Sequence, residues 1–195
     1  MKLTRLIPMI LVALCIVAGA SAAIAQDRAS LSKGEIHVAT EDVAGSDVPS
    51  MTMTAVIDAP PQKVWEIVSD CDKYESRMPN INEARELKRE GNKVFCEVEV
   101  DLPFPLSNLT AVTEAVHKTS SKKWSRTWTL VRGDYSVNNG SWVLSPFEDD
   151  AKRTLAVYTV HADPDTFVPD WAREKAQKSS FPDLMERLRK EVKKL

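Results

Sequence analysis

Apolar and polar side chains alternate in the stretch that ends at Ile57, where Met53, Ala55 and Ile57 occupy every second position. A period of two is typical of a strand with one buried face. Turn-forming residues at 44–47 separate this strand from an extended piece that begins near Lys33. Six further strand-like segments are joined by short turns and lie at 82–90, 93–101, 107–118, 123–132, 136–145 and 153–162. Sequential strands with hairpin turns predict an antiparallel sheet.

The pattern changes from strand to helix within a few residues after Ile57. Asp58 is expected to cap the helix with its side chain, and Pro60-Pro61 fix the backbone for a first helical turn. Apolar residues then recur at helical spacing and predict a helix over 61–69. A second short helix is predicted over 70–77, and the Met-Pro-Asn sequence that follows ends it.

A helical pattern also runs from about Pro169 to the end of the chain. Pro182 lies within it, and a proline inside a helix must kink or restart that helix. The residues expected to face inward recur at helical spacing: Trp171, Lys175, Ser179, Met185, Leu188 and Val192.

Residues 1–25 have the pattern of a signal peptide rather than of a folded element. Two basic residues precede an apolar run from Leu6 to Ala20, and Ala23-Ile24-Ala25 is a small-x-small cleavage site. We therefore predict cleavage after Ala25 and export to the periplasm or outside the cell. The mature chain, 26–195, has a length that suits one domain with a sizeable core.

The overall charge gives no reason to expect a nucleic-acid partner. The formal net charge is −2, and it becomes −4 without Lys2 and Arg5. A mildly acidic protein has no general electrostatic attraction to nucleic acid. Basic residues near the C-terminus are expected to be solvated and to complement the helix dipole. We expect a monomer.

Few residues have the spacing of a metal or catalytic site. Cys71 and Cys96 remain after processing, and we expect free thiols because a domain of this size does not need a disulfide. The three histidines, His37, His117 and His161, are scattered, and no Cys/His cluster has metal spacing. Neither a nucleophile elbow nor a glycine-rich phosphate loop is present. The sequence therefore predicts no metal, no cofactor and no catalytic residue.

The strand around Trp124 carries an arginine among apolar residues. Trp124, Arg126 and Trp128 share one face of this strand. A charge on an apolar face is costly unless it is paired or hydrogen-bonded. Arg126 could point into a hydrophobic cavity toward a ligand head group, or it could stack on tryptophan at the sheet edge with its tip in solvent. The sheet edge is the default for such an arginine, and periodicity does not decide between the two.

The segment Leu102-Pro103-Phe104-Pro105-Leu106 interrupts the alternation between two strands. It is apolar and stiffened by proline. It could form the mouth of a cavity or a tip that touches a membrane, or it could be a rigid corner that lets the sheet curve. An exposed Phe104 would favour the first interpretation.

The strand-to-helix transition, Ile57-Asp58-Ala59-Pro60-Pro61-Gln62-Lys63-Val64-Trp65, resembles the opening of the START-like (SRPBCC) superfamily. This superfamily includes the polyketide cyclase/dehydrase and coenzyme Q-binding families. Further matching residues are Asp70, Tyr74, Met78-Pro79-Asn80, Gly140 to Pro146, and Phe181-Pro182-Asp183-Leu184. The resemblance covers about residues 50–195. It implies an α+β helix-grip fold, in which a curved antiparallel β-sheet wraps around a long C-terminal α-helix and two short helices follow the first strand.

The resemblance also implies a function. Family members usually bind an apolar molecule between the sheet and the last helix, so we expect an exported binder or carrier of a hydrophobic, lipid-like molecule that touches membranes transiently. Two alternatives remain open: a cyclase, dehydratase or hydrolase for a bulky apolar substrate, or a protein whose large side chains fill the cavity. The residues expected to line the cavity are Trp65, Met78, Arg126, Trp128, Trp142, Tyr158, Trp171, Lys175, Ser179 and Met185.

Overall fold

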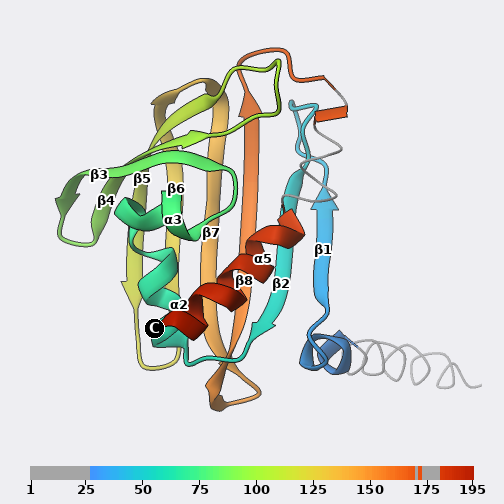
Figure 1. Ribbon diagram of the computed structural model, residues 1–195, viewed down its shortest axis with the longest axis vertical. Helices are drawn as coiled ribbons and strands as arrows, with labels where there is room; N and C mark the ends of the chain where they lie inside the picture. The colour runs from blue at the N-terminus through green and yellow to red at the C-terminus, as the bar shows by residue number, and fades with distance from the viewer. Residues whose placement is uncertain (1–26, 170, 173–180) are drawn as a thin grey trace, which may run out of the picture.

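An eight-stranded antiparallel sheet forms the body of the protein (Figure 1). The computed structural model describes residues 27–169, 171–172 and 181–195. The strand order is β1-β2-β8-β7-β6-β5-β4-β3, so the strands from β3 to β8 each pair with their neighbour in the chain. The strands are β1 (Ile36–Glu41), β2 (Ser50–Ile57), β3 (Ile81–Glu90), β4 (Lys93–Val100), β5 (Leu109–Thr119), β6 (Trp124–Gly133), β7 (Tyr135–Phe147) and β8 (Asp150–Pro164). Every strand expected from the alternation is present, with ends that differ by no more than three residues.

Two short helical segments follow β2, which is the second strand of the structure. The first is α2 (Pro61–Val68), and the second consists of the 3₁₀ turn η1 (Cys71–Lys73) and α3 (Tyr74–Arg77). The predicted side-chain cap at Asp58 is wrong, because α2 begins directly after Pro60 and has no side-chain capping bond. The Asp58 carboxylate instead accepts a hydrogen bond from Arg153 at 3.3 Å.

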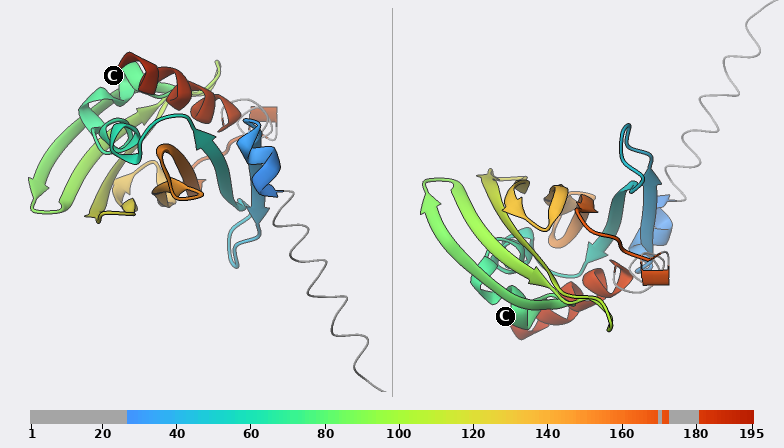
Figure 2. Two further views of the ribbon diagram at one scale, coloured as in Figure 1. Left: turned by 90° about the horizontal axis from the view of Figure 1, so that it is seen from below. Right: turned by 90° about the horizontal axis from the view of Figure 1, so that it is seen from above.

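The C-terminal segment packs on the concave side of the sheet, where α2 also lies (Figure 2). It consists of α5 (Phe181–Glu191) and η3 (Val192–Lys194). Met185, Leu188 and Val192 are buried in the core, as the helical spacing predicts. Pro182 is the second described residue of α5, so the kink or restart expected at this proline remains a prediction. Residues 173–180, over which the predicted long helix would continue, lie outside the described residues.

Cys71 and Cys96 form a disulfide, so the expectation of free thiols is wrong. Their Cα atoms are 6.3 Å apart, and both side chains are fully buried. The bond joins η1 to β4. Sequence spacing could not reveal this pairing, because the two residues are brought together by the packing of η1 and α3 against β3, the neighbour of β4.

Candidate ligand cavity

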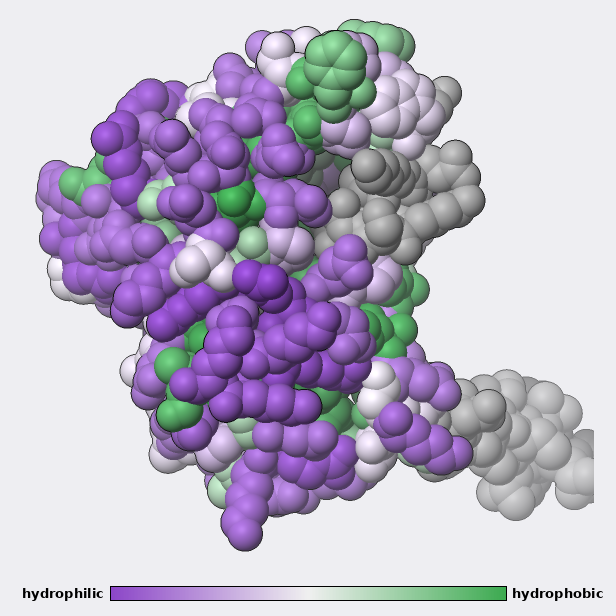
Figure 3. Space-filling model, viewed as in Figure 1, coloured by the Kyte–Doolittle hydropathy of each residue, from purple (hydrophilic) through white to green (hydrophobic). Residues whose placement is uncertain are grey.

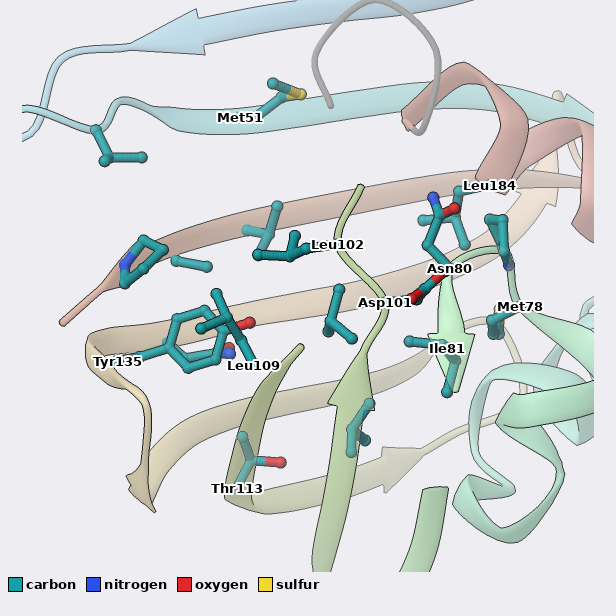
Figure 4. Close-up of a pocket in the computed structure, with 18 of the residues that line it drawn as sticks. Met51, Met78, Asn80, Ile81, Asp101, Leu102, Leu109, Thr113, Tyr135 and Leu184 are labelled. Atoms are coloured by element: carbon teal, nitrogen blue, oxygen red, sulfur yellow. The ribbon is translucent and has the colours of Figure 1, made fainter. Parts of the chain in front are cut away.

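A cavity of about 550 Å³ lies between the concave face of the sheet and the segments that cross it. Its wall comes from strands β2 to β8, from α3 and α5, and from the loops at one end of the sheet. Figure 4 shows part of this lining, from Tyr135 and Leu109 at one end to Leu184 of α5 at the other. Ligand pockets typically measure roughly 300–1,000 Å³. The idea that large side chains fill the interior is therefore wrong.

The strand register identifies the inner end of the cavity. Arg126, Trp142 and Tyr158 are paired neighbours on β6, β7 and β8, and all three line the cavity. In the next row beyond them, Leu144 is fully buried in the core that α2 helps to form. The row that contains Arg126 therefore closes the cavity at this end.

The opposite end forms the mouth. Leu109, Tyr135 and Pro164 line the cavity where β5 and β7 begin and where β8 ends. On β7 the mouth and the inner end are seven residues apart, from Tyr135 to Trp142, which is about 23 Å at the rise of a strand. The cavity is thus elongated along the strands.

Arg126 is buried at the inner end, with 4% of its surface exposed. Its guanidinium carbon lies 5.6 Å from the centre of the Tyr74 ring and 5.4 Å from that of Trp128. The guanidinium makes no hydrogen bond and no ion pair with any residue that the structure describes, and its Nε is fully buried. Arg126 therefore faces the cavity, and the default placement at a solvated sheet edge is wrong.

The charge of Arg126 affects its neighbours. His117 is the partner of Arg126 in the β5–β6 register. Burial, with smaller contributions from the positive charges of Arg126 and Arg89, lowers the pKa of His117 to about 4. The imidazole is therefore neutral at neutral pH.

Aromatic side chains surround the inner end. The Tyr158 ring lies 4.6 Å from that of Trp142 and 5.7 Å from that of Trp128, between ring centres. Burial raises the pKa of Tyr158 well above its usual value, with a smaller opposing effect from Arg126. Tyr158 therefore keeps its proton and presents a neutral hydroxyl.

Trp128 is held in place by two residues of β7. Its indole Nε1 donates a hydrogen bond to Asn138 Oδ1 at 3.1 Å. Gly140 is its partner in the strand register, and a Cβ at this position would overlap the Trp128 ring and the Thr159 carbonyl. The absence of a side chain at Gly140 thus leaves the space that the Trp128 indole occupies. The sequence contained this glycine among the residues of the family resemblance, but only the register reveals its steric role.

The other candidate residues are divided between the cavity, the core and the surface. Met78 lines the cavity beside α3. Trp65 is not part of the lining, because it packs edge-on against His117 with ring centres 5.0 Å apart. Met185 is fully buried in the core, and its neighbour Leu184 is the lining residue from α5.

Trp171 is 47% exposed and does not line the cavity, whereas the adjacent Ala172 does. The inward orientation that helical spacing predicts for Trp171 is therefore wrong. Lys175 and Ser179 lie outside the described residues.

The mouth has an apolar rim that the sequence revealed only in part. Leu102 and Pro103 line the cavity, and the adjacent Phe104 is 94% exposed. Phe167, in the segment after β8, is 82% exposed. Figure 3 shows hydrophobic residues gathered at the upper end of the molecule, over these two segments. The exposure of Phe104 favours the interpretation of its loop as a cavity mouth, whereas no sequence signal marked Phe167.

Ser46, His161 and Asp163 meet beside the mouth but lack the geometry of a catalytic triad. The Ser46 hydroxyl donates to Asp163 Oδ2 at 2.7 Å, and His161 Nε2 lies 3.2 Å from the same hydroxyl. In a catalytic triad the carboxylate accepts a hydrogen bond from the histidine, whereas here it accepts one from the serine. The three residues instead tie the β1–β2 loop to β8.

Two kinds of feature are absent from the described ranges. They contain no group of three or more His, Cys, Asp or Glu side chains that could hold a metal ion. Within the same ranges, no helix has the length and apolar character needed to cross a membrane.

A curved antiparallel sheet that grips a C-terminal helix is the helix-grip fold of START-like proteins, and the predicted fold class is confirmed. A family model described as polyketide cyclase / dehydrase and lipid transport matches residues 57–189. The chain belongs to this family, as the strand-to-helix motif predicted. Among curated proteins, no significant match to the chain is found.

Three solved structures illustrate the similarity. A STAR-related lipid transfer protein from Xanthomonas axonopodis has a TM-score of 0.70 and 19% identity, over 81% of this chain and 93% of that one. Human StAR-related lipid transfer protein 5 has a TM-score of 0.69 and 14% identity, over 92% and 98%. The Zhui aromatase/cyclase from Streptomyces has a TM-score of 0.59 and 17% identity, over 82% and 94%. At these identities the similarity establishes the fold alone.

Proposed function

We propose that this protein is an exported binder or carrier of a hydrophobic, lipid-like molecule held in the cavity. The observation that carries the proposal is the elongated cavity of about 550 Å³, which has an aromatic inner end and an open, apolar mouth. Two structurally similar proteins are named for lipid transfer, which agrees with this function. Fold similarity alone would be a weak argument, because one fold can host many functions.

Export is supported by two independent features. The signal-peptide pattern at 1–25 directs a chain out of the cytoplasm. The Cys71–Cys96 disulfide is of the kind that persists in oxidising compartments such as the periplasm. We propose the periplasm or the cell exterior as the place where the ligand is bound.

The rim of the mouth supports transient contact with membranes. Phe104 and Phe167 are large apolar side chains that face water beside the opening. Exposed apolar groups of this size often mark a contact surface. A monomer that touches a bilayer with this rim would open its cavity toward the lipid.

Native mass spectrometry of protein purified from the periplasm of its host tests the proposal. The wild-type protein should carry a lipid-sized adduct. Ala162→Trp should abolish the adduct, because Ala162 lines the cavity and an indole would occupy it. Val131→Trp, at a residue of β6 that is 52% exposed, is the matched control and should retain the adduct. No adduct on the wild-type protein, together with no binding to a lipid array, would contradict a lipid carrier.

The alternative is an enzyme of the cyclase, dehydratase or hydrolase type. It is favoured by one observation, namely that Arg126 and Tyr158 both line the cavity. General acid–base catalysis also requires a group that titrates near the working pH. The raised pKa of Tyr158 argues against that role, and His161 is bound to Ser46 outside the lining. Turnover of a p-nitrophenyl acyl ester that disappears in Tyr158→Phe would favour a hydrolase over a carrier.

A further inference from the structure

We infer that the ligand is an anionic amphiphile, whose carboxylate or phosphate head group binds Arg126 at the inner end of the cavity while its apolar chain extends toward the mouth. The inference rests on the proposed function, since it requires that the cavity hold a lipid-like molecule. It adds the charge of the ligand and the direction in which it lies.

Arg126 has hydrogen-bonding capacity that the described residues do not satisfy. A guanidinium has five N–H donors and is always charged. Arg126 is 96% buried, yet it has no acceptor and no carboxylate among the described residues. A buried charge without a partner is strongly destabilising. Because the guanidinium borders the cavity, a bound ligand can supply the missing acceptors.

The aromatic rings around Arg126 do not replace such a partner. Tyr74 and Trp128 lie within cation–π distance of the guanidinium. These contacts stabilise the charge but accept none of its N–H groups in the plane of the guanidinium. Contact with two aromatic faces leaves the N–H edge of the guanidinium available. That edge binds a carboxylate or phosphate through two parallel hydrogen bonds.

The charged residues of the lining are distributed unevenly along the cavity. The acidic residues of the lining, Asp47 and Asp101, belong to loops at the mouth. Arg126 is at the opposite end, and the described cavity-lining residues include no other cation. The potential therefore becomes more positive from the mouth inward, which favours an anionic group at the inner end and disfavours it at the rim.

The wall between these two ends of the cavity is apolar. Val98 and Val160 line it, together with other apolar side chains. A chain of methylene groups gains from contact with such a wall. An amphiphile whose head is bound by Arg126 places its apolar part along this wall and its end near the mouth.

Fluorescence titration with a matched pair of probes tests the inference. cis-Parinaric acid is a fatty acid, and its methyl ester has the same chain without the charge. Wild-type protein should bind the acid at least tenfold more tightly than the ester. Arg126→Met should weaken binding of the acid by roughly 10- to 100-fold, the value of a charge-assisted hydrogen bond, and change binding of the ester by less than about threefold.

Arg132→Met is the matched control on the same strand. Arg132 lies on β6 with a side chain that is 67% exposed and paired with Glu97 on the surface. This variant should bind both probes like the wild-type protein. Displacement of parinaric acid by oleate, by lysophosphatidic acid and by neutral monoolein then separates a carboxylate from a phosphate. Both anions should displace it better than monoolein, and the stronger of the two identifies the head group.

The outcomes separate this inference from the proposed function. If wild-type protein binds acid and ester equally, or if Arg126→Met weakens both equally, a hydrophobic carrier stands and the anionic head group is refuted. If wild-type protein binds neither probe and no competitor, the proposed function fails and the inference fails with it. The wild-type ratio of acid to ester decides the matter even if Arg126→Met does not fold.

Discussion

At the scale of single residues, the cavity depends on a few side chains whose direction alternation alone could not determine. The period of two placed Trp124, Arg126 and Trp128 on one face, and all three are buried. It could not tell whether this face meets water or the interior, because both possibilities have the same period. A hydrogen-bond partner could not indicate the direction either, because the described residues offer Arg126 none.

His117 gives a prediction at this scale. The unfolded chain takes up a proton on this residue near pH 6.5, whereas the folded chain does so only near pH 4. Between these values the unfolded state binds more protons, so the free energy of unfolding falls as the pH is lowered. His117→Gln should remove about 1–2 kcal/mol of this decrease, after allowance for partial exposure. Urea unfolding at pH 7 and pH 4.5 measures it, and the same decrease in both proteins would contradict the role of His117.

At the scale of elements, the sequence predicted strands well and helix ends less well. The strand β4, for example, follows a tight turn at Gly91-Asn92 and has an apolar residue at every second position from Val94 to Val100, and both signals are local. The start of α2 depends instead on the backbone of Pro60, which placed Asp58 outside capping reach.

The link between η1 and β4 gives a prediction at the scale of elements. Replacing Cys71 and Cys96 together by alanine should lower the free energy of unfolding by about 2–4 kcal/mol, because the unfolded chain is no longer cross-linked. Denaturant unfolding with and without dithiothreitol measures the effect. The reductant should destabilise the wild-type protein and leave the double variant unchanged. A wild-type transition that does not respond to reductant would contradict the prediction.

At the scale of the whole molecule, the fold class could be predicted from the family resemblance, whereas the volume of the cavity could be obtained only from the structure. Alternation and hairpin turns predict which segments are strands, but the β2–β8 pairing and the curvature of the sheet are long-range features. The volume of the interior depends on the sum of many side-chain directions. Gly140 illustrates this, since its missing Cβ is what admits the Trp128 ring.

The apolar rim gives a prediction for the molecule as a carrier. Phe104→Ser combined with Phe167→Ser should slow transfer of parinaric acid to vesicles of phosphatidylcholine and phosphatidylglycerol several-fold, because the rim loses apolar surface. The affinity for the probe in solution should stay the same, since neither phenylalanine lines the cavity. Leu87→Ser, at a residue of β3 that is 41% exposed, is the control and should transfer normally. Equal transfer rates in all three proteins would refute a membrane-contacting rim.

The strand order has a consequence for how the chain folds. The six strands from β3 to β8 form a continuous meander, so each can pair with its neighbour through a short hairpin. The pairing of β2 with β8 is different, because it joins Met51 to Val160 and closes a loop of more than a hundred residues. Closing a long loop carries an entropic cost that local hairpins avoid. The meander can therefore assemble first, with its concave apolar face open to solvent, and the arrival of β2 then completes the wall that encloses the cavity.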